Sequence, residues 1–89
     1  MSPEKIQKAL RIKRVVKEYF ATSNEEIVPA KDLMKQFIIA DIFSKDHKDG
    51  LPIRDFLREL DKEGYLNLIP QIHFEQKDQN KNWFFINKK

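Results

Sequence analysis

Leu51–Ile86 is the stretch that most constrains the fold, because it joins a well-defined helix to two strand patterns. Apolar residues recur at helical spacing up to Leu60, and Pro52 stands in the first turn, where proline is favoured. Gly64 follows and can adopt the left-handed conformation that ends a helix. Tyr65 is then placed for the apolar contact with Leu60 that accompanies a Schellman cap. The pattern predicts a helix that stops at Gly64.

Two strand patterns follow this helix, with a polar segment between them. Residues 65–74 alternate well enough to form the first strand, and the return strand is predicted at 83–86. In the return strand, Trp83 and Phe85 share one face and Phe84 and Ile86 the other, so we expect at least one aromatic pair to close the core over the helices. The intervening segment 75–82 is polar and predicts the tip of a hairpin.

The first half of the chain predicts two helices and a short strand. A helix is expected over residues 3–21, with Ser2 as its N-cap and proline at its first position. Residues 27–28 predict a short extended piece, because a helix that began before them would meet Pro29 in its interior. A second helix is expected to begin at Pro29 or the next residue. Its apolar spacing continues as far as Phe43.

Length and composition indicate one ordered domain. The chain has 89 residues, enough for one compact domain and too few for two independent cores. An apolar fraction of 40% supplies a core despite 35% charged residues, so we expect order over residues 3–86 and a tail at 87–89. The absence of cysteine excludes disulfides and thiolate metal sites. No stretch suits an export signal or a membrane span, so we expect a cytoplasmic protein without a membrane partner.

The polar segment 44–50 admits three interpretations. As a calcium loop it fails the EF-hand pattern. When its glycine is counted as position six, Lys45 falls at position one and Phe56 at position twelve, where carboxylates are required. As a transition-metal site it offers His47 and two aspartates but no clear further ligand, because His73 falls in a strand pattern. We therefore expect no metal and no other cofactor.

The third interpretation of this segment is structural. Asp46 and Asp49 would accept hydrogen bonds from backbone donors around the turn and the helix start. Lys45 and Lys48 would then remain free to approach phosphate groups. We prefer this interpretation, which makes the two lysines candidate DNA-binding residues.

The outer side of the helix that ends at Gly64 carries Arg54, Arg58 and Lys62 at four-residue intervals, in one basic row. Four acidic residues flank the row, so this helix is net negative although the chain carries a net charge of +3. Two interpretations stay open. The row faces a groove of nucleic acid, where an arginine fork binds guanine or phosphate in two places. Alternatively, its members form surface ion pairs worth at most about 1 kcal/mol each.

One partial motif raises the question of an enzymatic function. Asp61 followed by Glu75-Gln76-Lys77 superficially resembles the acidic and ExK elements of restriction-type nucleases. That chemistry needs carboxylates that converge on a metal from sheet positions, whereas Asp61 lies in a helix pattern and Glu75 lies beside the hairpin tip. The sequence also lacks a nucleophile elbow, a phosphate loop, a zinc motif and a dinucleotide turn. We expect no enzymatic activity.

The predicted order of elements is helix, short strand, helix, helix, strand, strand. This order resembles the winged helix-turn-helix superfamily, and the stretch IRDFLRELDKEGYL looks like the third helix and glycine turn of many small bacterial regulators. The resemblance covers nearly the whole chain. It implies an α+β winged helix with three helices, a short strand and a C-terminal β-hairpin wing. Its recognition helix would be Ile53–Tyr65.

In that superfamily, exposed residues of the third helix usually meet bases, and wing residues meet the backbone or the minor groove. The residues implied here are Arg54, Arg58 and Lys62 on the helix, with Lys77 and Lys81 on the wing. The resemblance thus implies a non-enzymatic module for double-stranded DNA, either a transcriptional regulator or an accessory factor. The alternative is a winged helix used for protein contact or as a homodimer, without DNA.

Overall fold

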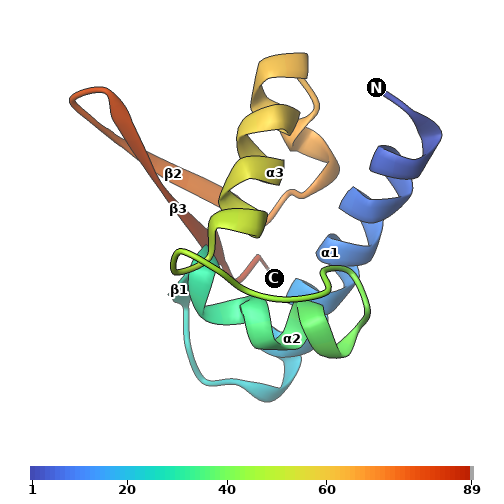
Figure 1. The fold of residues 1–89 in the computed structure, drawn as a ribbon. Helices are drawn as coiled ribbons and strands as arrows, with labels where there is room; N and C mark the ends of the chain where they lie inside the picture. The colour runs from blue at the N-terminus through green and yellow to red at the C-terminus, as the bar shows by residue number, and fades with distance from the viewer. Residues whose placement is uncertain (89) are drawn as a thin grey trace.

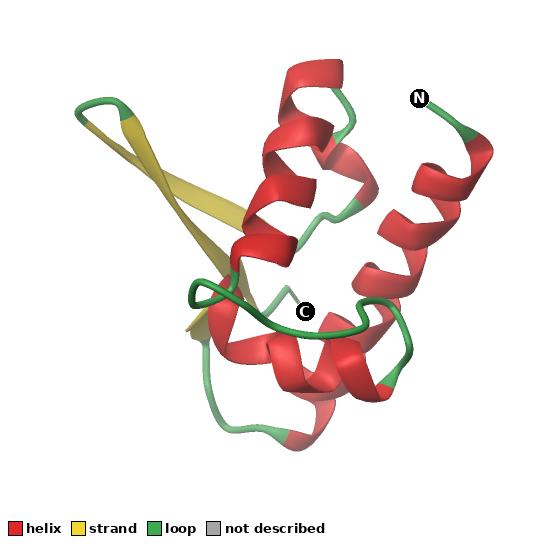
Figure 2. Ribbon diagram, in the orientation of Figure 1, coloured by secondary structure: helices red, strands yellow, loops and turns green. Residues whose placement is uncertain are grey.

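The structure is a computed structural model that describes residues 1–88, and within them it forms an α+β fold of three α-helices and a three-stranded antiparallel sheet (Figures 1 and 2). Two short 3-10 helices, η1 and η2, complete it. The elements are, in order, α1 (Pro3–Thr22), β1 (Ile27–Pro29), η1 (Ala30–Leu33), α2 (Met34–Ile39), α3 (Leu51–Glu63), η2 (Leu66–Leu68), β2 (Ile72–Lys77) and β3 (Asn80–Ile86). Within the described residues, no helix is long and apolar enough to cross a membrane.

Helix α1 forms where its N-cap and its apolar spacing predict it. The Lys5 N–H donates to Ser2 Oγ at 3.3 Å and so satisfies one of the free donors of the first turn. The side chains that recur on one face are buried: Ala9, Ile12, Val16 and Phe20. The short strand predicted at 27–28 is also confirmed, as part of β1.

The second helix is shorter than predicted. The chain first makes the 3-10 turn η1, and α2 then ends at Ile39 instead of reaching Phe43. The cause is a left-handed residue, Asp41, at φ 61°. The Ile42 N–H donates to Phe37 O at 2.9 Å, in the pattern of a Schellman cap. Ile42 is buried after this cap. Apolar spacing therefore persists in the sequence although the helix has stopped.

The predicted end of α3 is confirmed in its hydrogen bonds. Gly64 adopts φ 81°, its N–H donates to Asp61 O at 3.1 Å, and the Tyr65 N–H donates to Leu60 O at 2.8 Å. These are the two bonds of a Schellman motif. Helix α3 consequently stops at Glu63, and the chain turns back toward the sheet.

The sheet has the order β1-β3-β2, and both pairings are antiparallel. The strand predicted over 65–74 is wrong in its first half, because residues 66–68 form η2 and β2 begins only at Ile72. The predicted polar tip is also too long. Pairing continues to Lys77 opposite Asn80, and Asp78 at φ 56° makes the tight turn between them.

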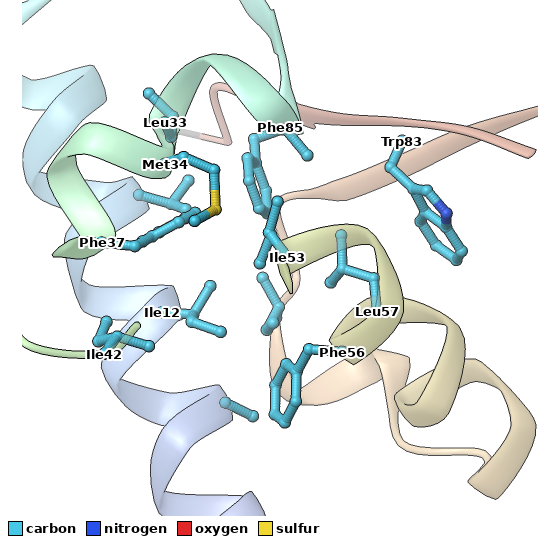
Figure 3. Packing of buried hydrophobic residues seen from close by; sticks show 14 of the residues in the cluster. Ile12, Leu33, Met34, Phe37, Ile42, Ile53, Phe56, Leu57, Trp83 and Phe85 are labelled. Atoms are coloured by element: carbon cyan, nitrogen blue, oxygen red, sulfur yellow. The ribbon is translucent and has the colours of Figure 1, made fainter. Parts of the chain in front are cut away.

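The core lies between the helices and the inner face of the sheet (Figure 3). Phe37 from α2 and Phe85 from β3 meet edge to face with ring centroids 6.0 Å apart. Trp83 and Phe85 share one face of β3, as their alternation predicts, and this face is the one turned toward the core. Asn87, which lies in the predicted tail, is still tied to the fold, since its N–H donates to Glu26 O at 2.9 Å. The last position of that tail, 89, lies outside the described residues.

Candidate functional site

A groove runs between α3 and the β2–β3 hairpin. Figure 1 shows α3 with α1 on one side and the hairpin on the other. The groove consists of two adjoining hollows that share Arg54, Lys81 and Asn82. The inner hollow lies toward η1, and its remaining lining residues are Pro29, Lys31, Asp49, Trp83 and Phe84. The outer hollow lies toward the hairpin turn, and its remaining lining residues are Arg58, Asp61, Lys62, Gln76, Gln79 and Asn80.

The lining of this α3–hairpin groove is predominantly cationic. Five basic side chains line it, against two acidic ones, Asp49 and Asp61. The basic residues come from three elements, and they are Lys31 of η1, Arg54, Arg58 and Lys62 of α3, and Lys81 of β3. The net charge of the groove is therefore positive, although α3 by itself is net negative.

The acidic residues of α3 pair with different neighbouring elements on different sides of the helix. Glu59 forms an ion pair with Lys5 of α1, and Glu63 lies 3.4 Å from the amino group of Met1. Both glutamates are thus paired on the α1 side and do not line the groove. Asp61 does line it and pairs with Lys81. Counting the charges of α3 along the sequence could not reveal this separation.

Arg54 lines both hollows of the groove and is partly exposed. Its Nη2 donates to Lys48 O at 2.6 Å, which anchors the guanidinium to the loop before α3. Its Nε is buried and has no hydrogen-bond partner. The carbonyl of Lys48 therefore orients one edge of the guanidinium and leaves a donor on another edge unused.

Arg58 and Lys62 occupy the exposed side of α3, one and two turns further along. Arg58 forms an ion pair with Asp55 on the same helix. Among the ion pairs of residues 1–88, none includes Lys62. The structure thus places Arg54, Arg58 and Lys62 along one groove of the protein. Of the two interpretations of the basic row, the surface ion pair is confirmed for Arg58.

The two hairpin lysines have different surroundings. Lys81 lies within β3 instead of in the predicted tip. It pairs with Asp61, and its Nζ stands over the ring of Phe74 at 4.5 Å from the centroid. Phe74 is 39% exposed beside Trp83. Lys77 is exposed at the end of β2 and does not line the groove.

The loop before α3 partly follows the structural interpretation. Asp46 Oδ1 accepts the Gly50 N–H at 2.9 Å, as predicted. Asp49 differs from the prediction, because it binds Lys31 Nζ at 2.9 Å instead of a backbone donor. The hydrogen bond and charge of the Asp49 carboxylate raise the pKa of Lys31. Lys45 and Lys48 are exposed but lie outside the groove lining.

Lys31 and Trp83 are groove residues that the sequence interpretation missed. No local pattern marks Lys31, because it reaches the groove only through the packing of η1 against α3. The single indirect signal is Gly50, at φ 87°. A Cβ at this position would lie 2.9 Å from Lys31 Cα and closer still to its Cβ. Only glycine allows η1 and the start of α3 to approach so closely.

The basic face of α1 supports the fold instead of forming part of the groove. Lys8 Nζ lies 4.5 Å from the ring centroid of Phe43 and 5.4 Å from that of Phe56. Burial, with a smaller effect from Arg11, lowers the pKa of Lys8. Arg11 itself donates to Ala40 O at 2.5 Å. These side chains hold α1 against α2 and α3.

Metal ligands do not gather in the part of the chain that the structure describes: no group of three or more His, Asp or Glu side chains could hold an ion there. Comparisons of the chain with protein-family models, with curated proteins and with solved structures found no significant match.

Proposed function

We propose that this protein is a non-enzymatic winged-helix module that binds double-stranded DNA through α3, the hairpin and the loop before α3. The element order and the sheet order β1-β3-β2 support the winged-helix assignment. In this proposal α3 is the recognition helix and the β2–β3 hairpin is the wing. An α-helix fits the width of the major groove, and a strand pair beside it can follow the backbone.

The separation of charge around α3 carries the proposal. Glu59 and Glu63 pair on the α1 side, while five basic side chains line the opposite groove. A surface that faces DNA must present cations, because phosphate contacts supply most of the affinity for a duplex. The net negative count of α3 therefore does not oppose DNA binding.

The basic side chains take different roles in this proposal. Arg58 and Lys62 are exposed on α3 and would reach toward base edges or phosphates. Lys45, Lys48 and Lys77 are exposed on either side of α3 and would contact the flanking backbone. Arg54 and Lys81 lie deeper, so they would bind phosphate at the floor of the groove instead of reading bases.

A charge-reversal titration tests the proposal. We expect fluorescently labelled duplex DNA to bind the wild-type protein at low salt and to lose most of that affinity at moderate salt. Arg58→Glu/Lys62→Glu is expected to weaken binding at least about tenfold, since it removes two cations and adds two carboxylates. Anisotropy at matched ionic strength measures the effect.

The matched control is Lys13→Glu/Arg14→Glu on the exposed side of α1, which alters the net charge by the same amount. This control is expected to lose far less affinity than the α3 pair. Equal losses would mean that total charge, and not the groove, governs binding. No binding by the wild-type protein even at low salt would overturn the DNA proposal.

A protein-contact function is the second candidate. Ile39 is 76% exposed at the end of α2, and Ile27 is 48% exposed in β1. Contact with another protein or with a second copy of the chain would remove these apolar side chains from water. A light-scattering mass for the same sample distinguishes a monomer from a homodimer.

A further inference from the structure

We infer that the inner hollow of the α3–hairpin groove is a phosphate-binding pocket, in which Trp83 Nε1–H and Arg54 Nε–H donate to the phosphate oxygens. Both residues line this hollow, together with Lys31 and Lys81. Where the phosphate belongs to a DNA backbone, the inference rests on the proposed function. The pocket would equally accept a free phosphate compound, so the two sources are separated in the experiment.

Two unused donors are the first observation that points to a ligand. Trp83 is only 4% exposed, and its Nε1 is buried without a hydrogen-bond partner. The Nε atom of Arg54 is likewise buried and has no hydrogen-bond partner. A buried N–H that lacks an acceptor loses its hydration without compensation, and such groups are rare in folded proteins. The two residues that carry these donors line the same hollow, where the oxygen of a ligand would supply the missing acceptor.

The direction of the indole is consistent with this role. Figure 3 shows Trp83 at the margin of the apolar cluster, with its nitrogen on the side of the ring away from Phe85 and Ile53. The ring packs toward the core and the polar atom faces outward from it. Trp83 therefore has the geometry of an aromatic anchor that keeps one donor for a ligand.

Three elements converge on the hollow and hold its donors in place. β1 pairs with β3 only as far as Pro29 opposite Phe84, so β3 continues past the end of β1 at Trp83. The carbonyl of Lys48 fixes the guanidinium of Arg54. The contact of Gly50 with Lys31 fixes η1 against the start of α3. The donors are thus positioned before a ligand arrives, which lowers the entropy lost on binding.

The chemistry of the lining selects an anion with several oxygens. The tryptophan N–H, the guanidinium and the lysine ammonium groups can donate but not accept. Asp49 is the one carboxylate of this hollow, and it is already bound to Lys31. Donors that approach from η1, α3 and β3 match a tetrahedral phosphate, whose oxygens point in different directions, better than a planar carboxylate.

Trp83 also reports on its own pocket, because it is the only tryptophan in the chain. We expect pyrophosphate to change its fluorescence saturably, while sodium chloride at the same ionic strength does not. A short unlabelled duplex should produce a comparable change, and pyrophosphate should displace a labelled duplex. If sodium chloride changed the Trp83 fluorescence as much as pyrophosphate does, the change would reflect ionic screening, and the pocket would be overturned.

Two conservative variants test the donors. Arg54→Lys keeps the charge but removes the Nε–H, and we expect it to weaken pyrophosphate binding roughly tenfold. Arg14→Lys is the matched control, because Arg14 is exposed on α1 and lines neither hollow of the groove. It should change pyrophosphate binding by less than about twofold.

Trp83→Phe keeps an aromatic ring and removes the indole N–H, so its duplex binding is followed by anisotropy of the labelled DNA. We expect a loss of roughly threefold to tenfold. Circular dichroism and thermal unfolding establish that each variant is folded before its binding is interpreted.

The outcomes separate this inference from the proposed function. Duplex binding that is unchanged in both Arg54→Lys and Trp83→Phe, together with unchanged pyrophosphate binding in Arg54→Lys, would overturn the pocket and leave DNA binding in place. Saturable pyrophosphate binding without any duplex binding would sustain the pocket for a free phosphate compound and overturn the DNA proposal. Weaker pyrophosphate binding in Arg54→Lys and weaker duplex binding in both variants, with Arg14→Lys like the wild type, support both.

Discussion

Two glycines bound α3 for different reasons. Gly64 adopts φ 81° at the C-terminal end, and nothing lies within 4 Å of where its Cβ would be. Gly50 adopts φ 87° at the N-terminal end, where a Cβ would collide with Lys31. Gly64 is therefore required for its backbone conformation alone, whereas Gly50 is required for both conformation and close packing.

This difference predicts unequal effects of alanine. Gly64→Ala is expected to cost about 1 kcal/mol of unfolding free energy, the strain of one left-handed residue. Gly50→Ala adds a steric clash between η1 and α3, and we expect a loss of about 2–4 kcal/mol. Urea unfolding followed by circular dichroism measures both. Equal losses would show that η1 yields without cost and that the packing of Lys31 is not constrained.

At the scale of elements, α3 has two sides with opposite electrostatic roles. The side that faces α1 uses Glu59 in a pair with Lys5, and the side that faces the hairpin uses Asp61 in a pair with Lys81. Both are partly exposed ion pairs, so each contributes little to stability. Their positions matter more for the field that a bound polyanion would meet.

Removing one carboxylate from each side gives a matched comparison on the same helix. Asp61→Asn takes a negative charge out of the groove and frees Lys81, and we expect duplex affinity to rise about threefold to tenfold. Glu59→Gln changes the net charge equally on the other side and should alter affinity by less than about twofold. Anisotropy titrations at low salt measure both. A larger gain in duplex affinity for Glu59→Gln than for Asp61→Asn would place the DNA on the α1 side of α3 and contradict the proposed surface.

At the scale of the whole molecule, β3 is the element that joins the fold to the groove. It is the central strand of the sheet, it contributes Phe85 to the core, and it carries Trp83 and Lys81 into the groove. Along one face of β3, the side chains thus change from apolar core residues to polar groove residues within five positions. The cationic groove is anchored directly to the core.

The proposed binding surface predicts a definite salt dependence. Seven phosphate contacts, from the cations of α3, the hairpin and the preceding loop, would give a slope of about −6 for log K against log salt. Lys62→Gln should reduce the magnitude of that slope by about 1. Lys13→Gln on α1 should leave it unchanged. A slope that both variants reduce equally would indicate binding without a defined face.

Much of the fold followed from local signals in the sequence. The start of α1, the short strand β1, the end of α3 and the shared face of Trp83 and Phe85 were all predicted correctly. Each depends on a cap, a proline, a glycine or an alternation that acts within a few residues of chain. The winged-helix assignment and the binding of DNA remain predictions.

Sequence alone therefore determined where α1 and α3 form and which side chains of β3 share a face, because those choices depend on near neighbours. Only the tertiary structure decided where α2 ends, how long the hairpin is and that the net charge of the groove is positive. It sorted the acidic residues of α3 by giving Glu59 a partner on α1, and it brought Lys31 to the groove across Gly50. Partners distant in sequence set those contacts, and charge and spacing along the chain do not encode their positions.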